Sequence, residues 1–327
     1  MITRLGDIQW SLLACCGTES RSVALASHLQ RGNFRRALVL EINDPDPLDK
    51  EALRSRLEER KRSFIDSGFA ENEVRRVNLL AGLDIIKGSV TELADAGATS
   101  LIIDITSFPK MWFFPIVQTA LEDIRFENVV VTYTSAIGYA NQLSENVGPL
   151  RVLPGFYADD GRSRHESLII GIGFEPVGIA SLLSDQVSNK IRLIFPFPPG
   201  PPGHHRNWMF VKQIEDLTQK EEMETPDRVH IHMYDCPQVF DALCDMTLNG
   251  KRSSAMAPYG PKTVSLAMCL FALAATEAGR ERVPVFYAQP HRYALDYTTG
   301  VRTTGDRPDV TGYCLKLRGR KLYSLMD

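Results

Sequence analysis

The sequence contains no run of about 18 consecutive apolar residues, the length that a membrane-spanning helix needs, and the apolar segment around Ile102 is interrupted by Asp104. The first ten residues, MITRLGDIQW, lack the long apolar stretch of a signal peptide. The six cysteines form no CxxC pair and several lie in apolar segments, which favours reduced, buried thiols over a disulfide framework. We therefore expect a cytoplasmic protein with no membrane partner.

Charge and composition exclude further classes of protein. A net charge of −3 gives no general attraction to nucleic acid. Apolar residues at 44% and charged residues at 24% are the mixture of a folded globular protein, which excludes intrinsic disorder and collagen-like order. Because typical domains have about 100–200 residues, a chain of 327 residues favours two domains.

Short apolar segments alternate with amphipathic segments through the first half of the chain. The periodicity predicts strands at 10–15, 37–42, 74–80, 101–105 and 129–133. It predicts helices at 20–30, 50–66, 84–94 and 113–124. This βαβαβαβαβ order is typical of a mainly parallel sheet with helices on both faces. We therefore expect a Rossmann-like lobe over residues 1–140.

The same alternation begins again after residue 166. Strands are expected at 168–172, 191–195, 229–234, 253–257 and 283–287, and a further one in the tail at 313–318. Helices are expected at 177–184, 208–219, 237–248 and 263–278. The fold class predicted is α/β, with two similar lobes that each contain a mainly parallel five-stranded sheet. The second lobe would span 167–327, after a connector at 141–166 that is rich in Gly, Pro and polar residues.

The two halves also share residues. VVVTYTSAIGYA at 129–140 aligns with VPVFYAQPHRYA at 283–294 with five identical positions. The other matches at a similar offset are Pro109-Lys110 with Pro261-Lys262, and Glu19 with Glu175. Three matches in the same order favour an internal duplication. The alternative is that similar residues mark the ends of unrelated βα units.

Four polar residues near the end of the fourth expected strand suit an anionic ligand: Asp104, Thr106, Ser107 and Lys110. Ligands of parallel sheets gather at the carboxyl ends of the strands. Hydroxyl groups, a lysine and the unpaired backbone N–H groups of a helix start together favour phosphate. Alternatively, Asp104 and Thr106 cap the helix, and Pro109 lies at its first position, where proline is favoured.

The second lobe has a related segment at 258–262. It replaces the hydroxyl groups with Gly260, which permits close approach of the backbone to a ligand, and it retains a cation at Lys262. We expect this segment to contact the ligand as well.

The D-x-T-x-x-x-K pattern of Asp104, Thr106 and Lys110 resembles the signature that follows the fourth strand in CARF domains, the Rossmann-like sensors of cyclic oligonucleotides in CRISPR defence. A chain with two such lobes resembles the SAVED architecture, a fusion of two CARF-like units found in antiphage signalling systems. The second lobe departs from the pattern, because Met256 replaces the Asp and Pro258 the Ser or Thr.

The resemblance covers the fold pattern of both lobes but only one short motif closely. It implies a cyclic oligonucleotide as ligand and a role as a sensor or regulatory subunit in prokaryotic antiviral defence. No nuclease, HEPN, protease or TIR segment is seen beyond the two lobes. We therefore expect a separate effector protein, or oligomerisation of the sensor, as the response to the ligand.

Aromatic and polar loops follow the fifth expected strand of each lobe. The first loop carries Tyr133, Ser135 and Tyr139. The second carries Tyr287, Gln289, His291, Arg292 and Tyr293. Tyrosines at the rim of a sheet can stack on bases, and the arginine can pair with phosphate. Alternatively, the tyrosines pack the two lobes together.

Glu19 and Glu175 follow the first expected strand of each lobe. A carboxylate there can act as a base, hold a ribose hydroxyl, or interact favourably with the positive end of its helix. The GxG at 171–173 lacks the third glycine of a dinucleotide-binding fingerprint, so NAD binding has little support.

Histidines give little support for a metal site. His230 and His232 alternate on one expected strand, and His204 and His205 are expected in the Pro-rich loop FPFPPGPPGHH. A metal site needs a third ligand with matching geometry, which the sequence does not locate. We expect no metal and no other cofactor.

These patterns favour a protein that binds a phosphate-bearing nucleotide in a cleft formed by the two lobes. The alternative is an enzyme on the same scaffold, such as a phosphodiesterase or ring nuclease, or a nucleotide hydrolase or transferase. Turnover would need a general base, for which Glu19, Glu175 and His291 are candidates. A third hypothesis is a structural subunit with vestigial clefts.

Overall fold

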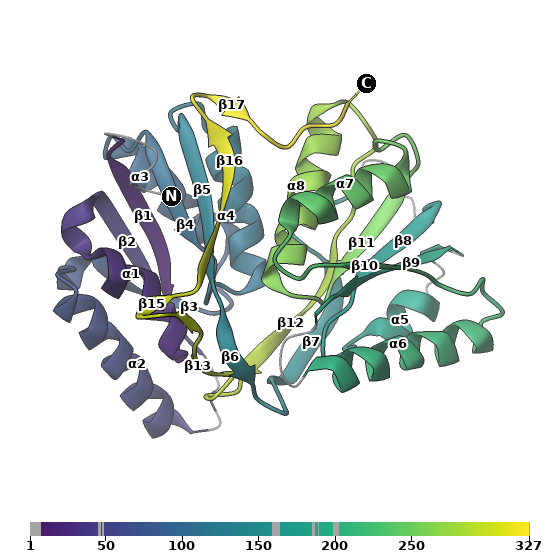
Figure 1. Cartoon of the computed structure of the whole chain (residues 1–327), viewed down its shortest axis with the longest axis horizontal. Helices are drawn as coiled ribbons and strands as arrows, with labels where there is room; N and C mark the ends of the chain where they lie inside the picture. The colour runs from purple at the N-terminus through teal and green to yellow at the C-terminus, as the bar shows by residue number, and fades with distance from the viewer. Residues whose placement is uncertain are drawn as a thin grey trace. The chain divides into compact units, whose positions relative to one another are not determined.

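The computed structural model describes residues 8–44, 47, 49–158, 164–184, 187–188, 190–198 and 203–326. The chain forms two compact units (Figure 1). Unit 1 contains Met1–Asn146 and Pro290–Leu322, and unit 2 contains Val147–Gln289 and Tyr323–Asp327. Each unit has its own parallel sheet.

The sheet of unit 1 has seven strands among the described residues, in the order β17-β16-β5-β4-β1-β2-β3. The strands are β1 (Trp10–Cys16), β2 (Phe34–Asn43), β3 (Val74–Asn78), β4 (Ser100–Asp104), β5 (Asn128–Thr134), β16 (Val310–Leu317) and β17 (Arg320–Lys321). Strands β1 to β5 are parallel to their neighbours, whereas β16 is antiparallel to β5.

Helices cover both faces of this sheet (Figure 1). They are the 3₁₀ helix η2 (Ser20–Val23), α1 (Ala24–Leu29), α2 (Lys50–Asp66), α3 (Leu83–Asp95) and α4 (Lys110–Glu122). On one face, Leu12 and Ala14 of β1 pack with Leu25 of α1 and Phe64 of α2 in a single hydrophobic core. All seven residues of β1 are buried. Burial on both faces is the reason that this strand reads as a continuous apolar run.

Unit 2 contains four parallel strands in the order β10-β9-β8-β11. They are β8 (Ser167–Gly171), β9 (Ile191–Pro196), β10 (Asp227–Ile231) and β11 (Ser254–Pro258). The helices are α5 (Ile179–Ser184), α6 (Gly203–Lys220), α7 (Cys236–Thr247) and α8 (Lys262–Glu277). Leu168 and Ile170 of β8 pack with Phe210 and Ile214 of α6 in the core of this unit. No helix in the described parts of the chain has the length and apolar character needed to cross a bilayer.

Six further strands pair in twos among the described residues. They are β6 (Ala136–Tyr139) with β13 (Thr298–Val301), β7 (Ser144–Val152) with β12 (Phe286–Tyr293), and β14 (Thr303–Thr304) with β15 (Arg307–Pro308). The β6–β13 pair is antiparallel and brings a C-terminal segment onto unit 1.

The predicted α/β class with mainly parallel sheets is confirmed, but two similar five-stranded sheets are not. Among the described residues, the sheet of unit 1 contains the five predicted strands together with β16 and β17, and the sheet of unit 2 contains only four strands. The segment 283–287, expected as the fifth strand of the second lobe, makes a single bridge between Val285 and Met256. The N–H of Val285 instead donates to the carbonyl of Phe156, and its own carbonyl accepts from the N–H of Leu153. Backbone from the expected connector therefore takes the hydrogen bonds that a sheet neighbour would have made.

The expected domain boundaries also differ from the two units. The connector predicted at 141–166 contains β7, and residues 290–322, expected in the second lobe, belong to unit 1. Strand β16 pairs with β5, whose seven residues are all buried. Because an apolar edge strand left open is a site for aggregation, this pairing is a physical reason for the return of the chain to unit 1.

Candidate functional site

The strand order of unit 1 places β1 beside both β2 and β4. The loops that follow β1 and β4 then lead to helices on opposite faces of the sheet, and such a topological switch point is the usual ligand site of open α/β sheets. Gly17 and Ser107 meet there, since a Cβ atom built on Gly17 would lie 3.3 Å from the Cβ of Ser107. The site predicted from the sequence after β4 therefore lies beside the loop that carries Glu19.

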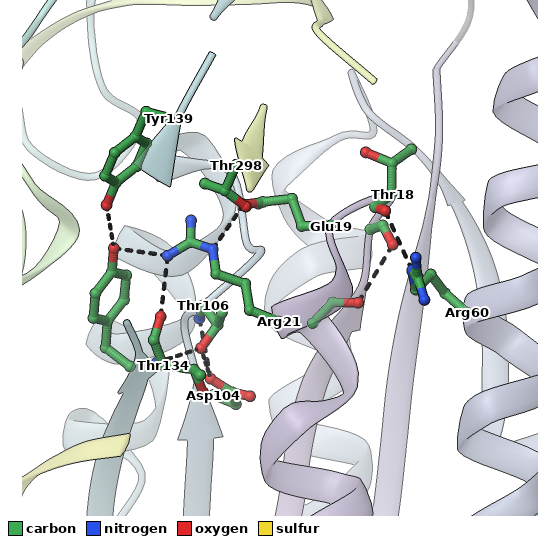
Figure 2. A network of polar contacts seen from close by, with 12 residues as sticks. Thr18, Glu19, Arg21, Arg60, Asp104, Thr106, Thr134, Tyr139 and Thr298 are labelled. Carbon is green, nitrogen blue, oxygen red and sulfur yellow. Dashed lines mark hydrogen bonds and ion pairs between the residues drawn. The ribbon is translucent and has the colours of Figure 1, made fainter. Parts of the chain in front are cut away.

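Arg21 occupies the centre of a buried polar network at these strand ends (Figure 2). Only 1% of Arg21 is exposed. Its Nε donates to Glu19 Oε2 at 2.7 Å, and its Nη1 donates to the Tyr133 hydroxyl at 2.7 Å and to the Thr134 carbonyl at 3.1 Å. Burial opposes the charge, but the adjacent Glu19 carboxylate more than compensates and holds the pKa of Arg21 well above its usual value. The guanidinium is therefore charged.

The second terminal nitrogen of Arg21, Nη2, donates to none of the residues that the structure describes. No dashed line reaches this nitrogen in Figure 2. A guanidinium has five N–H donors, of which Nε and Nη1 use three here. The two N–H groups of Nη2 remain for another acceptor.

Tyrosines pack around this guanidinium. The Tyr133 and Tyr139 hydroxyls are 3.0 Å apart, and the ring of Tyr297 lies 6.4 Å from Tyr139 and 5.9 Å from Tyr293. Burial, and after it the Glu19 carboxylate, raises the pKa of Tyr297. Only 2% of Tyr133 is exposed, and its place in the network fits packing within unit 1 better than stacking on bases, which was one of the two alternatives.

The D-x-T motif has its hydrogen bonds within the protein. Asp104 Oδ1 accepts from the N–H of Thr106 at 3.1 Å and from the Thr106 hydroxyl, which in turn accepts from the N–H of Thr134 at 2.9 Å. The only proton of the Thr106 hydroxyl is thus donated in the hydrogen bond to Asp104. These residues position the strand ends and connect them, through Thr134, to Arg21.

The start of α4 differs from the capped helix that was the alternative expectation. The helix begins at Lys110, its N-cap is Pro109, and no side chain caps it. Ser107 is 8% exposed, and its hydroxyl has no hydrogen-bond partner among the described residues. Lys110 is buried as well. An uncapped helix start, a buried hydroxyl and two cations are the components of an anion site.

Two contacts of this site were not predicted from the sequence. Thr298 of β13 donates its hydroxyl to Glu19 Oε2 at 2.6 Å. Arg60 of α2 donates its Nε to the carbonyl of Thr18 at 3.3 Å (Figure 2). The sequence carries no signal for either contact, because each partner is distant in the chain and Arg60 lies in a charged helix.

The corresponding segment of unit 2 has a different environment. Helix α8 also begins with a lysine, Lys262, after a proline N-cap without a capping side chain. However, a Cβ built on Gly260 would lie 2.9 Å from the carbonyl oxygen of Ile172, and one built on Gly173 would lie 2.1 Å from that of Tyr259. These glycines thus permit close approach of the unit's own loops, rather than the approach of a ligand that was expected for Gly260.

The other predicted site residues are divided between the units. Glu175 lies in unit 2, where its carboxylate is 3.5 Å from Arg206. His291, Arg292 and Tyr293 lie on β12 in the part of that strand that belongs to unit 1, and all three are half-buried. The structure therefore groups Glu19, but not Glu175, with the D-x-T motif.

Histidine and cysteine side chains form no metal site in the described residues, where no group of three or more His, Cys, Asp or Glu could hold an ion. His204 and His205 lie in α6 rather than in a loop, and residues 199–202 of the Pro-rich segment lie outside the described residues. All six cysteines are free thiols, as expected. Burial raises the pKa of Cys16 to about 12.

Comparison with known proteins gives no family. No family model matches the sequence, and no curated protein matches it. The methyltransferase domain of bacterial CtHen1 is similar at a TM-score of 0.21 and 11% identity over 41% of this chain and 60% of that chain. A branched-chain phosphotransacylase from Enterococcus faecalis V583 is similar at a TM-score of 0.19 and 11% identity, over 84% and 90% of the two chains. The chain thus spans 60% of the length of the first of these structures.

Proposed function

We propose that unit 1 binds a nucleotide-derived, phosphate-bearing ligand at its topological switch point. The observation that carries this proposal is Nη2 of Arg21, which belongs to a buried guanidinium and donates to no described residue. Guanidinium groups pair strongly with phosphate oxygens, so a phosphate at this position would satisfy the donors.

The start of α4 supports the same ligand chemistry. Its N-terminus has no capping side chain, and the buried Ser107 hydroxyl has no partner within the described chain. Lys110, the first residue of the helix, places a cation where the helix dipole is already positive. An anion bound there would reduce the repulsion between the lysine and the positive end of the helix dipole, and would accept hydrogen bonds from the N–H groups at the helix start.

By the resemblance to CARF domains, the ligand would be a cyclic oligonucleotide. The protein would then be a sensor subunit of a prokaryotic antiviral system, and ligand binding would alter its contacts with a separate effector protein or its oligomeric state.

We also propose that the two units are Rossmann-like lobes from an internal duplication. In each unit the first four parallel strands lie in the order third, second, first, fourth. In each, the fourth strand leads to a helix that begins with lysine after a proline N-cap. A cleft shared by the two lobes and a cytoplasmic location stay predictions.

The state of Glu19 favours binding over turnover. Its Oε2 atom accepts from both Arg21 and Thr298. A carboxylate held in a buried ion pair is a weak general base, since protonation would leave the arginine without its counter-ion. Glu175 is paired with Arg206 in unit 2, whereas the residues proposed to bind phosphate belong to unit 1.

The proposal is tested by thermal unfolding of the purified chain with cyclic di-, tri- and tetra-adenylate, ATP and NAD. A ligand present at about 100 times its Kd adds about 2.7 kcal/mol of stability, a rise in Tm of roughly 5–10 °C. Chromatography of the same samples shows whether the compound is intact, as binding requires, or cleaved, as the enzyme alternative requires. No rise in Tm with any compound would refute the proposal.

Ser107→Ala is the most informative variant, because the hydroxyl it removes supports no other described residue. The matched control is Ser11→Ala, which removes an equally buried hydroxyl without a described partner from the interior of β1. The rise in Tm should shrink in Ser107→Ala and persist in Ser11→Ala. Equal shifts in the two variants would place the ligand elsewhere.

A further inference from the structure

We propose that the chain binds one ligand molecule, in unit 1, because the equivalent switch point of unit 2 is closed by its own backbone. This inference rests on the proposed function of unit 1 and adds its stoichiometry. In unit 2, β8 lies between β9 and β11, as β1 lies between β2 and β4 in unit 1. The loops after β8 and β11 are therefore the structural equivalents of the loops that carry Gly17 and Ser107.

The loops of unit 2 touch backbone to backbone. A Cβ on Gly173 would lie 2.1 Å from the carbonyl oxygen and 2.7 Å from the carbonyl carbon of Tyr259. From the other loop, a Cβ on Gly260 would lie 2.9 Å from the carbonyl oxygen of Ile172. Neither glycine has a positive φ, so the requirement for glycine is steric. No phosphate fits between groups that exclude a methyl carbon.

Unit 1 is less tightly closed at the same place. The nearest atoms to a Cβ on Gly17 would be the Cβ of Ser107 at 3.3 Å and its Oγ at 3.6 Å. These are side-chain atoms, and the serine hydroxyl has no described partner that holds it. Rotation about χ1 moves the Ser107 Oγ but not its Cβ, so a methyl group at Gly17 needs a shift of a few tenths of an ångström at Ser107. Unit 2 would need a larger displacement, of backbone against backbone.

Side chains secure the closed loops of unit 2. Tyr259, at the position equivalent to Ser107, donates its hydroxyl to the Val177 carbonyl at 2.7 Å and packs edge-on against Phe210 at 5.3 Å. Burial raises the pKa of this tyrosine. Asn207 donates its Nδ2 to the Gly173 carbonyl at 3.0 Å. The Ser107 hydroxyl, which unit 1 can offer to an anion, is thus replaced in unit 2 by the Tyr259 hydroxyl, which already donates to Val177.

The ligand-independent test compares two glycine variants in the full chain. Gly173→Ala should lower the Tm by more than about 5 °C or prevent folding, because backbone must move to admit the Cβ. Gly17→Ala should lower it by less than about 3 °C, because the contact with Ser107 needs a shift of only a few tenths of an ångström. An unchanged Tm for Gly173→Ala would show that the loops of unit 2 separate readily and would overturn the inference.

The second test is calorimetric titration with the compound, among the cyclic adenylates, ATP and NAD, that raises the Tm most. We expect one molecule bound per chain, a Kd at least about tenfold weaker in Ser107→Ala, and a Kd within about twofold of the wild-type value in Lys262→Ala. Two molecules per chain, or equal weakening in Lys262→Ala, would overturn the single site and leave the proposed function intact. Absence of binding by every compound would refute the proposed function itself.

Discussion

Neutralisation of Glu19 should destabilise unit 1 strongly. In Glu19→Gln an oxygen remains to accept from Arg21 and Thr298, so the change removes mainly the negative charge beside a buried guanidinium. The pair is 2.7 Å apart with side chains 1% and 10% exposed. Removal of one partner of a buried ion pair costs about 3–5 kcal/mol. Because Glu19 keeps some contact with solvent, we expect about 3 kcal/mol.

The assay is urea unfolding, together with calorimetry that follows the transition of each unit. A loss of this size lowers the Tm of the unit-1 transition by roughly 6–12 °C. Arg21→Met, which removes the opposite charge, and the double variant complete a thermodynamic cycle. The matched control is Glu58→Gln, which breaks the exposed Arg54–Glu58 pair and should leave the transition unchanged.

Two results would refute this reasoning. One is a loss in Glu19→Gln no larger than that in the Glu58→Gln control. The other is additivity of the two single changes within about 0.5 kcal/mol, because groups that interact directly show coupling beyond that value.

Three further predictions concern other parts of the chain. Hydrogen bonding by Arg125 lowers the pKa of Asp123 in the folded state. The Asp123 carboxylate therefore stabilises the folded state above the unfolded pKa of about 3.9, and this stabilisation is lost as the pH falls through the folded pKa. Asp123→Asn should therefore be less stable than wild type at pH 7 and converge with it in acid, and a constant difference in urea titrations would contradict this. With a pKa of about 12, Cys16 should resist thiol reagents at pH 8 until urea unfolds the chain, as labelling with mass spectrometry would show. Trp112→Phe removes a buried donor to the Leu79 carbonyl at 3.0 Å and should lower the free energy of unfolding by about 1–3 kcal/mol, and no change in urea midpoint would count against that bond.

The positions of the central parallel strands β1, β4, β5, β8 and β11 were predictable because all their residues are buried. A strand such as β4, buried at all five residues, produces a continuous apolar run that periodicity detects. The start of α8 was also predictable, since the Pro-Lys pattern that opens α4 opens it too. In both cases the signal is local in the sequence.

Pairing between distant segments was not predictable in this way. The likeness of 129–140 to 283–294 suggested equivalent strands, yet Tyr133 lies in a central strand and Tyr287 in β12, which pairs with β7. Identical residues in two segments therefore do not determine which strand each segment pairs with. The partner depends on contacts between distant segments, and here Val285 forms hydrogen bonds with Leu153 and Phe156 of the expected connector.

The candidate site was predictable in its placement and not in its central residue. Glu19, Asp104 and Thr106 were expected at strand ends and do lie in one network. Arg21 was missed because arginine is normally exposed. Its burial depends on partners such as Tyr133, which is 112 residues away in the chain.

The central claim is that a phosphate binds at the switch point of unit 1. The most direct measurement is a crystal structure of the chain with whichever of the tested nucleotides raises its Tm most. A phosphate oxygen should lie about 2.7–3.2 Å from Nη2 of Arg21, with the Ser107 hydroxyl and the start of α4 around the same group. A ligand bound anywhere else, with Nη2 of Arg21 facing solvent or protein, would contradict the account.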